Sequence, residues 1–348
     1  MNSVRESKGS RVLLASLTQR TDSIEVSALS IQDGHPVVSS HHLADPLQGQ
    51  AIIRPSLVLI SKADIHTCRN PDFAGVLGHQ FVGVVESAPD STLVGKRVVA
   101  DVNITDPNST YAKRGIGHHD PDRQILGLYN HDGCLSHRFS IPERNLAVVP
   151  DEIDDQRAVF ASQLAAAVHV SRIERVEGKT FVTVLGGDLT ALLCAQVMSN
   201  LNASVRMLTQ RADRLELCAK WGIKHRNIAE VGRRADQDIV INTMSEPDAL
   251  ATSIRMTRPR GAVILQSHPI AAIEDQSLTT DDLTLVIERE LRLHGSRCGQ
   301  ITDGLAALQS GRIDLSGLIT KRVKFTDVMA GLRAAIEPEH IGVLVQMH

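Results

Sequence analysis

A short apolar strand that runs directly into a glycine turn most constrains the fold of this chain. The run Phe181–Leu185 is followed by Gly186 and Gly187, and apolar residues then recur at helical spacing from Leu189. Three further strand-like runs alternate with helical patterns in the same region: Val205–Thr209, Asp238–Asn242 and Gly261–Gln266. Repeated strand–helix–strand units predict an α/β fold with a doubly wound parallel sheet, whose ligand lies at the carboxyl ends of the strands.

The chain before this region has a different texture. Short β-branched runs, separated by Gly, Pro, Asp and Asn, occur at Arg11–Leu17, Ala51–Ile60, Phe81–Ser87, Arg97–Val102 and Leu146–Val149. This spacing predicts an irregular β-rich region. After Leu291 the texture is mixed again, with helices near Asp303–Ser310 and Asp327–Ile336 and a last strand at Gly342–Gln346.

Composition limits the function classes. At 348 residues the chain is long enough for two domains of about 100–200 residues each. The 37 Lys and Arg residues against 40 Asp and Glu give a net charge of −3, so charge provides no argument for binding nucleic acid or a membrane. Five scattered cysteines without a CxxC pair argue against a disulfide framework. With no signal-peptide pattern near the start, we expect a cytoplasmic protein.

The glycine turn has the placement of a dinucleotide-binding turn. Such a turn needs a first glycine for its tight bend, a second for close approach of the diphosphate, and a small third residue for packing. Gly186 and Ala191 match the first and third roles, with Gly187 between the first and second positions. Asp188 occupies the second position, where its carboxylate would face the diphosphate. The alternative is an ordinary strand–helix turn that binds no nucleotide.

The end of the next strand bears on which cofactor binds. That strand ends Thr209-Gln210-Arg211, and an arginine there accommodates the 2′-phosphate of NADP, whereas NAD enzymes place an acidic residue. We therefore expect NADP in preference to NAD; the alternative is that Arg211 is a solvated residue of the following helix. Thr243, directly after the third strand, completes the predicted cofactor-binding set.

Several segments, taken in order, resemble the medium-chain dehydrogenase/reductase superfamily, in its zinc alcohol, threonine and sorbitol dehydrogenase-like branch. The segments are Gly78–Val85, Val94–Val98, Asp132–Leu135, Val149–Asp151 with Phe160–Ala167, the glycine turn, Arg258–Gly261 and Ser310–Arg312. The resemblance implies a GroES-like, β-rich catalytic domain at residues 1–154 and 291–348. It also implies a Rossmann-type dinucleotide-binding domain at 155–290, with the active site in the cleft between the two.

The resemblance also identifies the positions of the family's zinc ligands, which differ here. A ligand cysteine is replaced in Ser61-Lys62-Ala63-Asp64, the ligand histidine is His79 followed by Gln80, and Ser162 stands at the later ligand position. The four cysteines of the family's structural zinc lobe correspond to Asn103, Asp106, Ser109 and Gly117. Because hydroxyls and amides cannot replace thiolate or carboxylate ligands, we predict that no zinc is bound.

The same alignment yields candidate catalytic residues. Ala63 stands where the family carries a proton-relay hydroxyl, but Asp64 remains beside the histidine position. An Asp64–His79 pair would fix the imidazole tautomer and leave His79 as a general acid or base; the alternative is a buried structural hydrogen bond. Lys62, with Ser61, is predicted to stabilise a developing oxyanion. Lys62 is also placed to neutralise Asp188 or contact phosphate, or else to be an exposed lysine without a partner.

Two functions are consistent with these residues. The first is a zinc-independent NAD(P)-dependent oxidoreductase that transfers hydride between nicotinamide and a small carbonyl, alcohol or activated alkene. The second is a non-catalytic protein of the same fold with a binding or assembly role, which the loss of the zinc ligands, the relay hydroxyl and the middle glycine favours. We expect a small-molecule partner and, by analogy with the superfamily, a homodimer.

Overall fold

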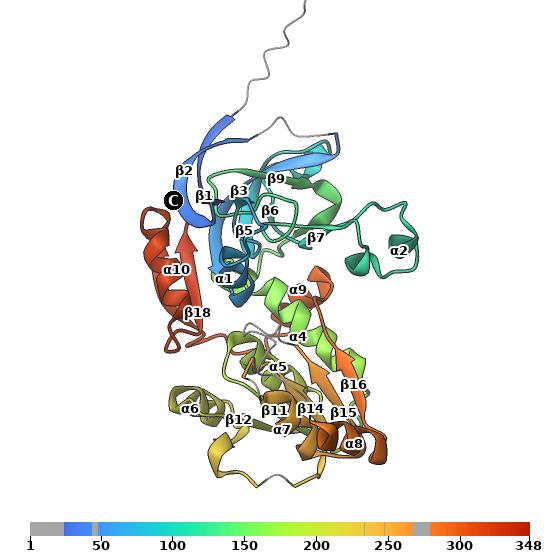
Figure 1. The fold of residues 1–348 in the computed structure, drawn as a ribbon. Helices are drawn as coiled ribbons and strands as arrows, with labels where there is room; N and C mark the ends of the chain where they lie inside the picture. Colours follow the sequence, from blue (N-terminus) through green and yellow to red (C-terminus); the bar gives the residue numbers. More distant parts are fainter. Residues whose placement is uncertain (1–23, 44–47, 233, 247, 267–278) are drawn as a thin grey trace, which may run out of the picture.

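A computed structural model describes residues 24–43, 48–232, 234–246, 248–266 and 279–348. The chain forms a β-rich part and a part built on a parallel sheet, drawn in the upper and lower halves of Figure 1, with α4 and α9 between them. The predicted strand Arg11–Leu17 lies outside the described residues. The predicted α/β fold, with a β-rich part and a doubly wound parallel sheet, is confirmed.

The β-rich part is organised around a mixed sheet. Within the described residues this sheet has seven strands in the order β10-β6-β5-β3-β18-β17, with β9 pairing beside β3. Its strands are β3 (Gln50–Ile60), β5 (Phe81–Ser87), β6 (Arg97–Ala100), β9 (Phe139–Pro142), β10 (Leu146–Val148), β17 (Ile319–Lys324) and β18 (Gly342–Gln346). Smaller sheets pair β1 (Ile24–Gln32) with β2 (His35–Leu43) and β4 (Gly75–Val76), and β7 (Asn103–Ile104) with β8 (Gln124–Ile125).

The second sheet is parallel throughout. Its strands are β11 (Phe181–Leu185), β12 (Ser204–Thr209), β13 (Lys224–Asn227), β14 (Gln237–Asn242), β15 (Thr257–Leu265) and β16 (Arg292–Gly295). They lie in the order β13-β12-β11-β14-β15-β16, which is the 3-2-1-4-5-6 order of a dinucleotide-binding sheet. The strand order reverses between β11 and β14, so a crevice for a ligand is expected outside the carboxyl ends of these two strands.

The chain returns to the first sheet later than residue 291. Strand β16, which begins at Arg292, pairs with β15 at the edge of the parallel sheet. The first strand to rejoin the mixed sheet is β17. The segment that follows the predicted boundary at 290 therefore contributes one more strand to the parallel sheet.

Ten α-helices within the described residues cover the sheets and line the space between them. They are α1 (Lys62–Cys68), α2 (Thr110–Lys113), α3 (Asp155–Ala158), α4 (Ala161–Ile173), α5 (Leu189–Asn200), α6 (Ala212–Lys220), α7 (Ala249–Met256), α8 (Thr280–Glu288), α9 (Ile301–Gln309) and α10 (Val328–Ile336). Local sequence fixes several of their ends. Helix α6, for example, is followed by Gly222 at φ +68°, the left-handed conformation that glycine adopts without steric cost.

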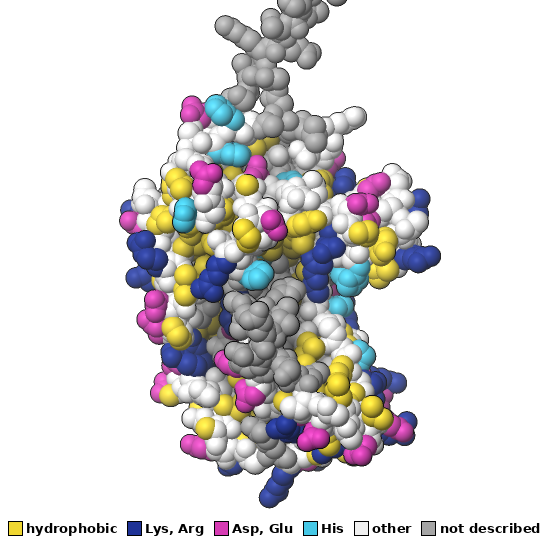
Figure 2. Space-filling model, viewed as in Figure 1, with side chains coloured by type: hydrophobic (Ala, Val, Ile, Leu, Met, Phe, Trp, Pro, Cys, Tyr) yellow, Lys and Arg dark blue, Asp and Glu magenta, His cyan; other side chains and the backbone are white. Residues whose placement is uncertain are grey.

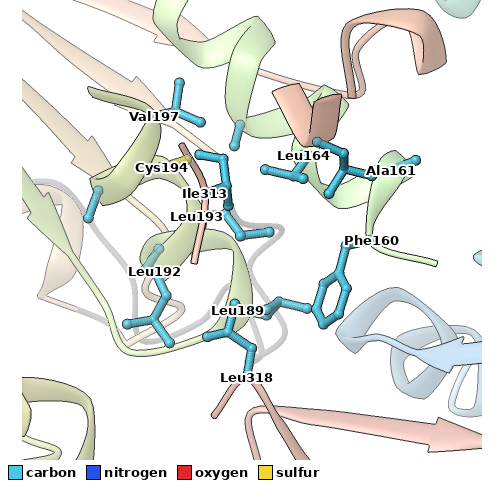
Figure 3. Packing of buried hydrophobic residues seen from close by; sticks show 14 of the residues in the cluster. Phe160, Ala161, Leu164, Leu189, Leu192, Leu193, Cys194, Val197, Ile313 and Leu318 are labelled. Carbon is cyan, nitrogen blue, oxygen red and sulfur yellow. The ribbon is translucent and has the colours of Figure 1, made fainter. Parts of the chain in front are cut away.

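One hydrophobic cluster joins the two sheets. It runs from strand residues of the mixed sheet, such as Leu59, through Phe160 and Leu164 to the inner face of α5. Figure 3 shows Phe160 and Leu164 close to Leu189 and Leu193 of α5. A second cluster fills the β-rich part alone. The two parts thus share a core, and this shared packing fixes the walls of the space between them.

The surface carries no concentration of one charge on the face in view. Basic and acidic side chains are interspersed over both halves in Figure 2. No helix in the described part of the chain has the length and apolar character needed to span a bilayer.

Candidate active site

A cavity of about 380 Å³ lies between the β-rich part and the parallel sheet. Small-molecule sites are typically about 300–1,000 Å³ in volume, so this cavity has the size of one. Helix α1 contributes to its wall from the upper half of Figure 1 and helix α5 from the lower half. Polar side chains in the wall include Lys62, His79, Gln80, Ser162, Asp188 and Gln266.

Helix α1 begins with a capping box that fixes the first carboxylate of the site. The Ser61 hydroxyl accepts a hydrogen bond from the Ala63 amide at 3.0 Å, and Asp64 Oδ2 accepts one from the Ser61 amide at 2.8 Å. These reciprocal bonds satisfy two amides that the helix itself leaves unpaired. The carboxyl group of Asp64 is therefore held in one orientation by the start of its own helix.

The other oxygen of Asp64 holds the imidazole of His79. Asp64 Oδ1 lies 2.8 Å from His79 Nδ1, with Asp64 fully buried and His79 only 6% exposed. Because a carboxylate accepts, the ring proton is assigned to Nδ1, and Nε2 accepts a bond from the Gln80 amide nitrogen at 3.2 Å. The structure thus forms the expected Asp64–His79 pair; its chemical role remains a prediction.

The side chains around His79 are not suitable ligands for zinc. Zinc requires three or four thiolate, imidazole or carboxylate ligands, whereas the Ser61 and Ser162 side chains are hydroxyls. The Nε2 lone pair of His79 faces the amide of Gln80 rather than an open coordination position. Across the described ranges, no three or more His, Cys, Asp or Glu side chains are grouped so that they could hold a metal ion.

Cys68 does not supply a thiolate to this site at neutral pH. Burial, together with the nearby charge of Asp64, raises the pKa of the Cys68 thiol to about 11. A protonated thiol is a poor metal ligand and a poor nucleophile. Cys68 is therefore expected to be an inert thiol at neutral pH.

The glycine turn lies at the reversal of strand order and leaves no space for side chains. Gly186 has a φ of +135°, and a Cβ added there would overlap the hydroxyl of Thr243. A Cβ at Gly187 would lie 2.7 Å from Thr209 Oγ1. Ala191 is fully buried and packs beneath the turn. The structure thus brings all five of these predicted cofactor-binding residues to one place.

Asp188 is the N-cap of α5, and its carboxylate has three partners. Oδ1 accepts from the Ala191 amide at 2.8 Å and from Thr243 Oγ1 at 3.1 Å, while Oδ2 lies 2.8 Å from Lys62 Nζ. Partial burial opposes a charge on the amine, but the carboxylate of Asp188 outweighs it and raises the pKa of Lys62. Of the two contacts considered for Lys62, the structure forms the one with Asp188.

Arg211 lies beside the glycine turn, at the start of α6. Its backbone amide donates to Thr209 Oγ1 at 3.3 Å, and its guanidinium lies 3.4 Å from the Asp213 carboxylate with the side chain 40% exposed. That 3.4 Å contact is made by its Nε, which is buried and makes no hydrogen bond to the described residues. A role for Arg211 in binding a 2′-phosphate remains a prediction.

Sequence reasoning missed Arg214, which fastens the glycine turn to the β-rich part. This arginine is only 2% exposed, and it donates to the carbonyl oxygens of Gly187 at 3.1 Å and Pro338 at 2.8 Å. Pro338 lies between α10 and β18, whose strand belongs to the mixed sheet. No local signal marks this role, because the second partner is a backbone carbonyl 124 residues further along the chain.

Two further titratable groups in the cavity wall were also missed. Burial raises the pKa of Asp101, which accepts hydrogen bonds from the amide and side chain of Asn103. Burial likewise raises the pKa of Cys298. The predicted strand Arg97–Val102 contains Asp101 as its one acidic residue, and that interruption of an apolar run was the available signal.

Comparison with known sequences gives one matching domain family and relatives that match about three quarters of the chain. The Alcohol dehydrogenase GroES-like domain matches residues 47–151. A putative D-xylulose reductase from Agrobacterium fabrum is 25% identical over 288 residues, covering 78% of this chain and 81% of the relative. An L-threonine 3-dehydrogenase from a Chelativorans species is 26% identical over 277 residues, covering 74% of this chain and 78% of the relative.

Solved structures share the fold over nearly the whole chain. A short chain alcohol dehydrogenase from Escherichia coli, complexed with NADH, has a TM-score of 0.84 at 20% identity and covers 93% of this chain and 99% of its own. A putative zinc-binding dehydrogenase from Sinorhizobium meliloti, bound to NADP, has a TM-score of 0.82 at 19% identity and covers 93% and 100%. At these identities the likeness shows the fold alone.

Proposed function

The chain belongs to the medium-chain dehydrogenase/reductase superfamily, and on that premise we propose that it is an NAD(P)-dependent oxidoreductase. Its reaction would interconvert a small alcohol and carbonyl compound, or reduce an activated alkene. One observation carries the proposal: His79, which is paired with Asp64, and Asp188, which directly follows Gly186 and Gly187, line the same cavity of about 380 Å³. A cofactor held at the turn and a proton-transfer group are thus available to one substrate.

The residues at the turn fit a nicotinamide dinucleotide, apart from Asp188. The backbone of Gly186 and Gly187 presents no side chain toward a ligand, and Arg211 stands where the adenosine ribose would lie. A bound nicotinamide would supply or accept the hydride. The cofactors bound to two proteins of the same fold, NADH and NADP, support this class of cofactor.

The protein's own contribution would be proton transfer and charge stabilisation. His79 would accept or return a proton at Nε2 once the Gln80 amide, which donates to it at 3.2 Å, gives way, and Asp64 would then fix the tautomer and stabilise the imidazolium. The Ser61 hydroxyl uses its oxygen as a helix cap, so its proton remains free to be donated to an oxyanion. The ammonium of Lys62 adds a positive charge to the same wall of the cavity.

We further propose that the reaction runs without zinc. The chemistry of the side chains around His79 supports this, since hydroxyls and an amide stand where charged ligands are needed. Elemental analysis of protein purified without chelators should give well below one zinc per chain. Stoichiometric zinc would overturn this part of the proposal.

Cofactor binding is the first test of the function. Titration of the purified protein with NADPH and NADH, followed by nicotinamide fluorescence and thermal shift, should show saturable binding that is tighter for NADPH. No response to either nucleotide at millimolar concentration would contradict the function. His79→Gln should abolish turnover of any substrate found, while leaving NADPH binding unchanged.

The preference for NADP is tested by reversing one charge. Arg211→Glu should weaken NADPH binding at least about tenfold more than NADH binding, since only NADPH carries the 2′-phosphate. Arg175→Glu is the matched control: it makes the same change of net charge at a side chain that is 87% exposed and lies outside the cavity wall. Equal weakening of the two cofactors by Arg211→Glu would refute the role.

A non-catalytic binding protein of the same fold is the second candidate. The observation that favours it is Asp188, whose carboxylate is directed at the place where a diphosphate would lie. Failure to bind either nicotinamide cofactor, with the fold intact, would favour this candidate over the first.

We also propose a homodimer formed along the edge strand β16. Leu283, Ile287 and Leu293, on α8 and β16, are 48%, 77% and 40% exposed, and an unpaired edge strand can extend its sheet by pairing with a second copy. Light scattering should give a molecular mass twice that of one chain, and Ile287→Glu should reduce this to the mass of a single chain.

The five free cysteines in the described residues support a reducing compartment, which we propose to be the cytoplasm.

A further inference from the structure

We infer that Asp188 is a built-in competitor of the cofactor's diphosphate, and that its ion pair with Lys62 sets how tightly this chain binds a nicotinamide dinucleotide. The inference rests on the proposed function and concerns the same site. It assigns control of cofactor affinity to a residue that departs from the glycine expected at this position of the turn.

One amide of the helix terminus that would bind a diphosphate is already bonded within the chain. A diphosphate binds at such a turn by accepting from the free amides of the first helical turn. Here Asp188 Oδ1 accepts from the Ala191 amide at 2.8 Å and from Thr243 Oγ1 at 3.1 Å. A phosphate oxygen would therefore compete with a carboxylate that is already in hydrogen-bonding position.

The charge of Asp188 opposes the same ligand. Its side chain is 16% exposed, so solvent screens it less than a surface carboxylate, and a diphosphate beside it meets like charge. Lys62 offsets that charge at 2.8 Å, with a second carboxylate, Glu246, also acting on its amine. The charge of Asp188 also acts on Arg214, but the guanidinium of Arg214 donates its hydrogen bonds to Gly187, Pro338, Glu339 and Asp213 rather than to Asp188.

The ion pair also joins the two walls of the cavity. Lys62 begins α1 in the β-rich part, and Asp188 caps α5 against the parallel sheet. A dinucleotide that lies along the turn must separate this pair or rearrange it around its phosphates. Once released from Asp188, the ammonium of Lys62 could form an ion pair with the diphosphate. The residue that neutralises Asp188 in the free protein would then stabilise the bound cofactor.

The cap and the charge of Asp188 can be separated by substitution. An N-cap needs a side-chain oxygen that accepts, and asparagine provides one as well as aspartate does. Asp188→Asn therefore retains the cap and removes only the charge. Asp188→Gly removes both and restores the glycine that allows close approach of a diphosphate.

The test measures dissociation constants of NADPH and NADH for the full chain by fluorescence and calorimetry. Asp188→Asn should bind both cofactors about tenfold more tightly, and Asp188→Gly at least as tightly as Asp188→Asn. Lys62→Met should weaken both, because Asp188 loses its partner. Asp154→Asn is the matched control, since Asp154 caps α3 through the Arg157 amide and lies outside the cavity wall.

The outcomes separate this inference from the proposed function. If the wild-type chain binds cofactor and Asp188→Asn binds no more tightly while unfolding at the wild-type temperature, the inference is wrong and the function stands. If only the Asp188 variants bind, the inference is supported and the proposed function fails for the natural chain. If neither the wild type nor any variant binds at millimolar cofactor, both are overturned.

Discussion

Two carboxylates at the starts of helices beside one cavity have different roles. Asp64 is the third residue of α1 and accepts a hydrogen bond from the amide of Ser61, whereas Asp188 is the N-cap of α5 and accepts one from the amide of Ala191. Their remaining bonding capacity goes to different partners. Asp64 holds the imidazole of His79 within the β-rich part, whereas Asp188 reaches Lys62 from the other side of the cavity.

Burial separates the two further. Asp64 is fully buried, so every partner it lost would leave an unpaired group inside the protein. Asp188 is 16% exposed and its partner Lys62 is 55% exposed, so water can replace either partner. The comparison teaches that the Asp64–His79 pair is held in one geometry, while the Asp188–Lys62 pair can be opened at low cost.

The largest effect is expected at Asp64. Asp64→Ala leaves the Nδ1–H of His79 and the amide of Ser61 without an acceptor, and at about 1–3 kcal/mol for each buried unpaired group the free energy of unfolding should fall by about 3 kcal/mol. Urea denaturation measures this. Asp64→Asn retains one acceptor and should lose less. A loss below about 1 kcal/mol for Asp64→Ala would contradict the comparison.

The burial of Cys68 near Asp64 should also be detectable. Because burial and this carboxylate raise the pKa of the Cys68 thiol to about 11 from 9.0, the thiolate fraction at pH 8 is about a hundredfold below that of an unperturbed thiol. Iodoacetamide should alkylate Cys68 slowly at pH 8 and progressively faster toward pH 11, as followed by peptide mass spectrometry. The urea-unfolded chain is the control, and rapid labelling of the folded protein at pH 8 would be inconsistent with this account.

A smaller effect is expected at Asp188. Asp188→Ala removes the N-cap of α5 and should cost about 1 kcal/mol, whereas Asp188→Asn keeps the cap and should unfold within about 0.5 kcal/mol of the wild type. The pair of variants thus separates the cap from the charge in stability as well as in binding. Equal losses for the two variants would show that the charge, not the cap, stabilises the helix.

The smallest effect is expected at Lys62. Because this side chain is 55% exposed, Lys62→Met should change the free energy of unfolding by less than about 1 kcal/mol, and the change should shrink as salt is added. Thermal unfolding at two ionic strengths provides the measurement. A larger, salt-independent loss would mean that the pair across the cavity is held as firmly as the pair of Asp64 and His79.

Where the sequence carried a periodic signal, the fold could be predicted closely. Phe81–Ser87, Phe181–Leu185 and Gly342–Gln346 are strands with the predicted bounds, because each is a short apolar run between glycine or polar residues. The edge strands β2 and β16 were not predicted. Their residues are mostly exposed and polar, so they lack the apolar run or alternation on which the prediction depends.

The residues of the candidate site likewise include some that could be predicted from the sequence and some that could not. The glycine turn could be placed because it follows the end of a strand that local sequence defines, whereas the Asp64–His79 pair was implied by the resemblance to the dehydrogenase family. The bond between Lys62 and Asp188 was one of several alternatives, since sequence does not show which groups meet across a cavity. The role of Arg214 could not be predicted, because its partners are backbone carbonyls that any residue carries.

The hydrophobic cluster that joins the sheets has a consequence for how the chain can be divided. Residues of the mixed sheet such as Leu59 and Val82 belong to the same cluster as Phe160, Leu164 and Leu192. A fragment cut between the two sheets would expose one side of that cluster to water. We therefore expect the two parts, although separate in topology, to unfold together, and a truncation to either part alone to be destabilised.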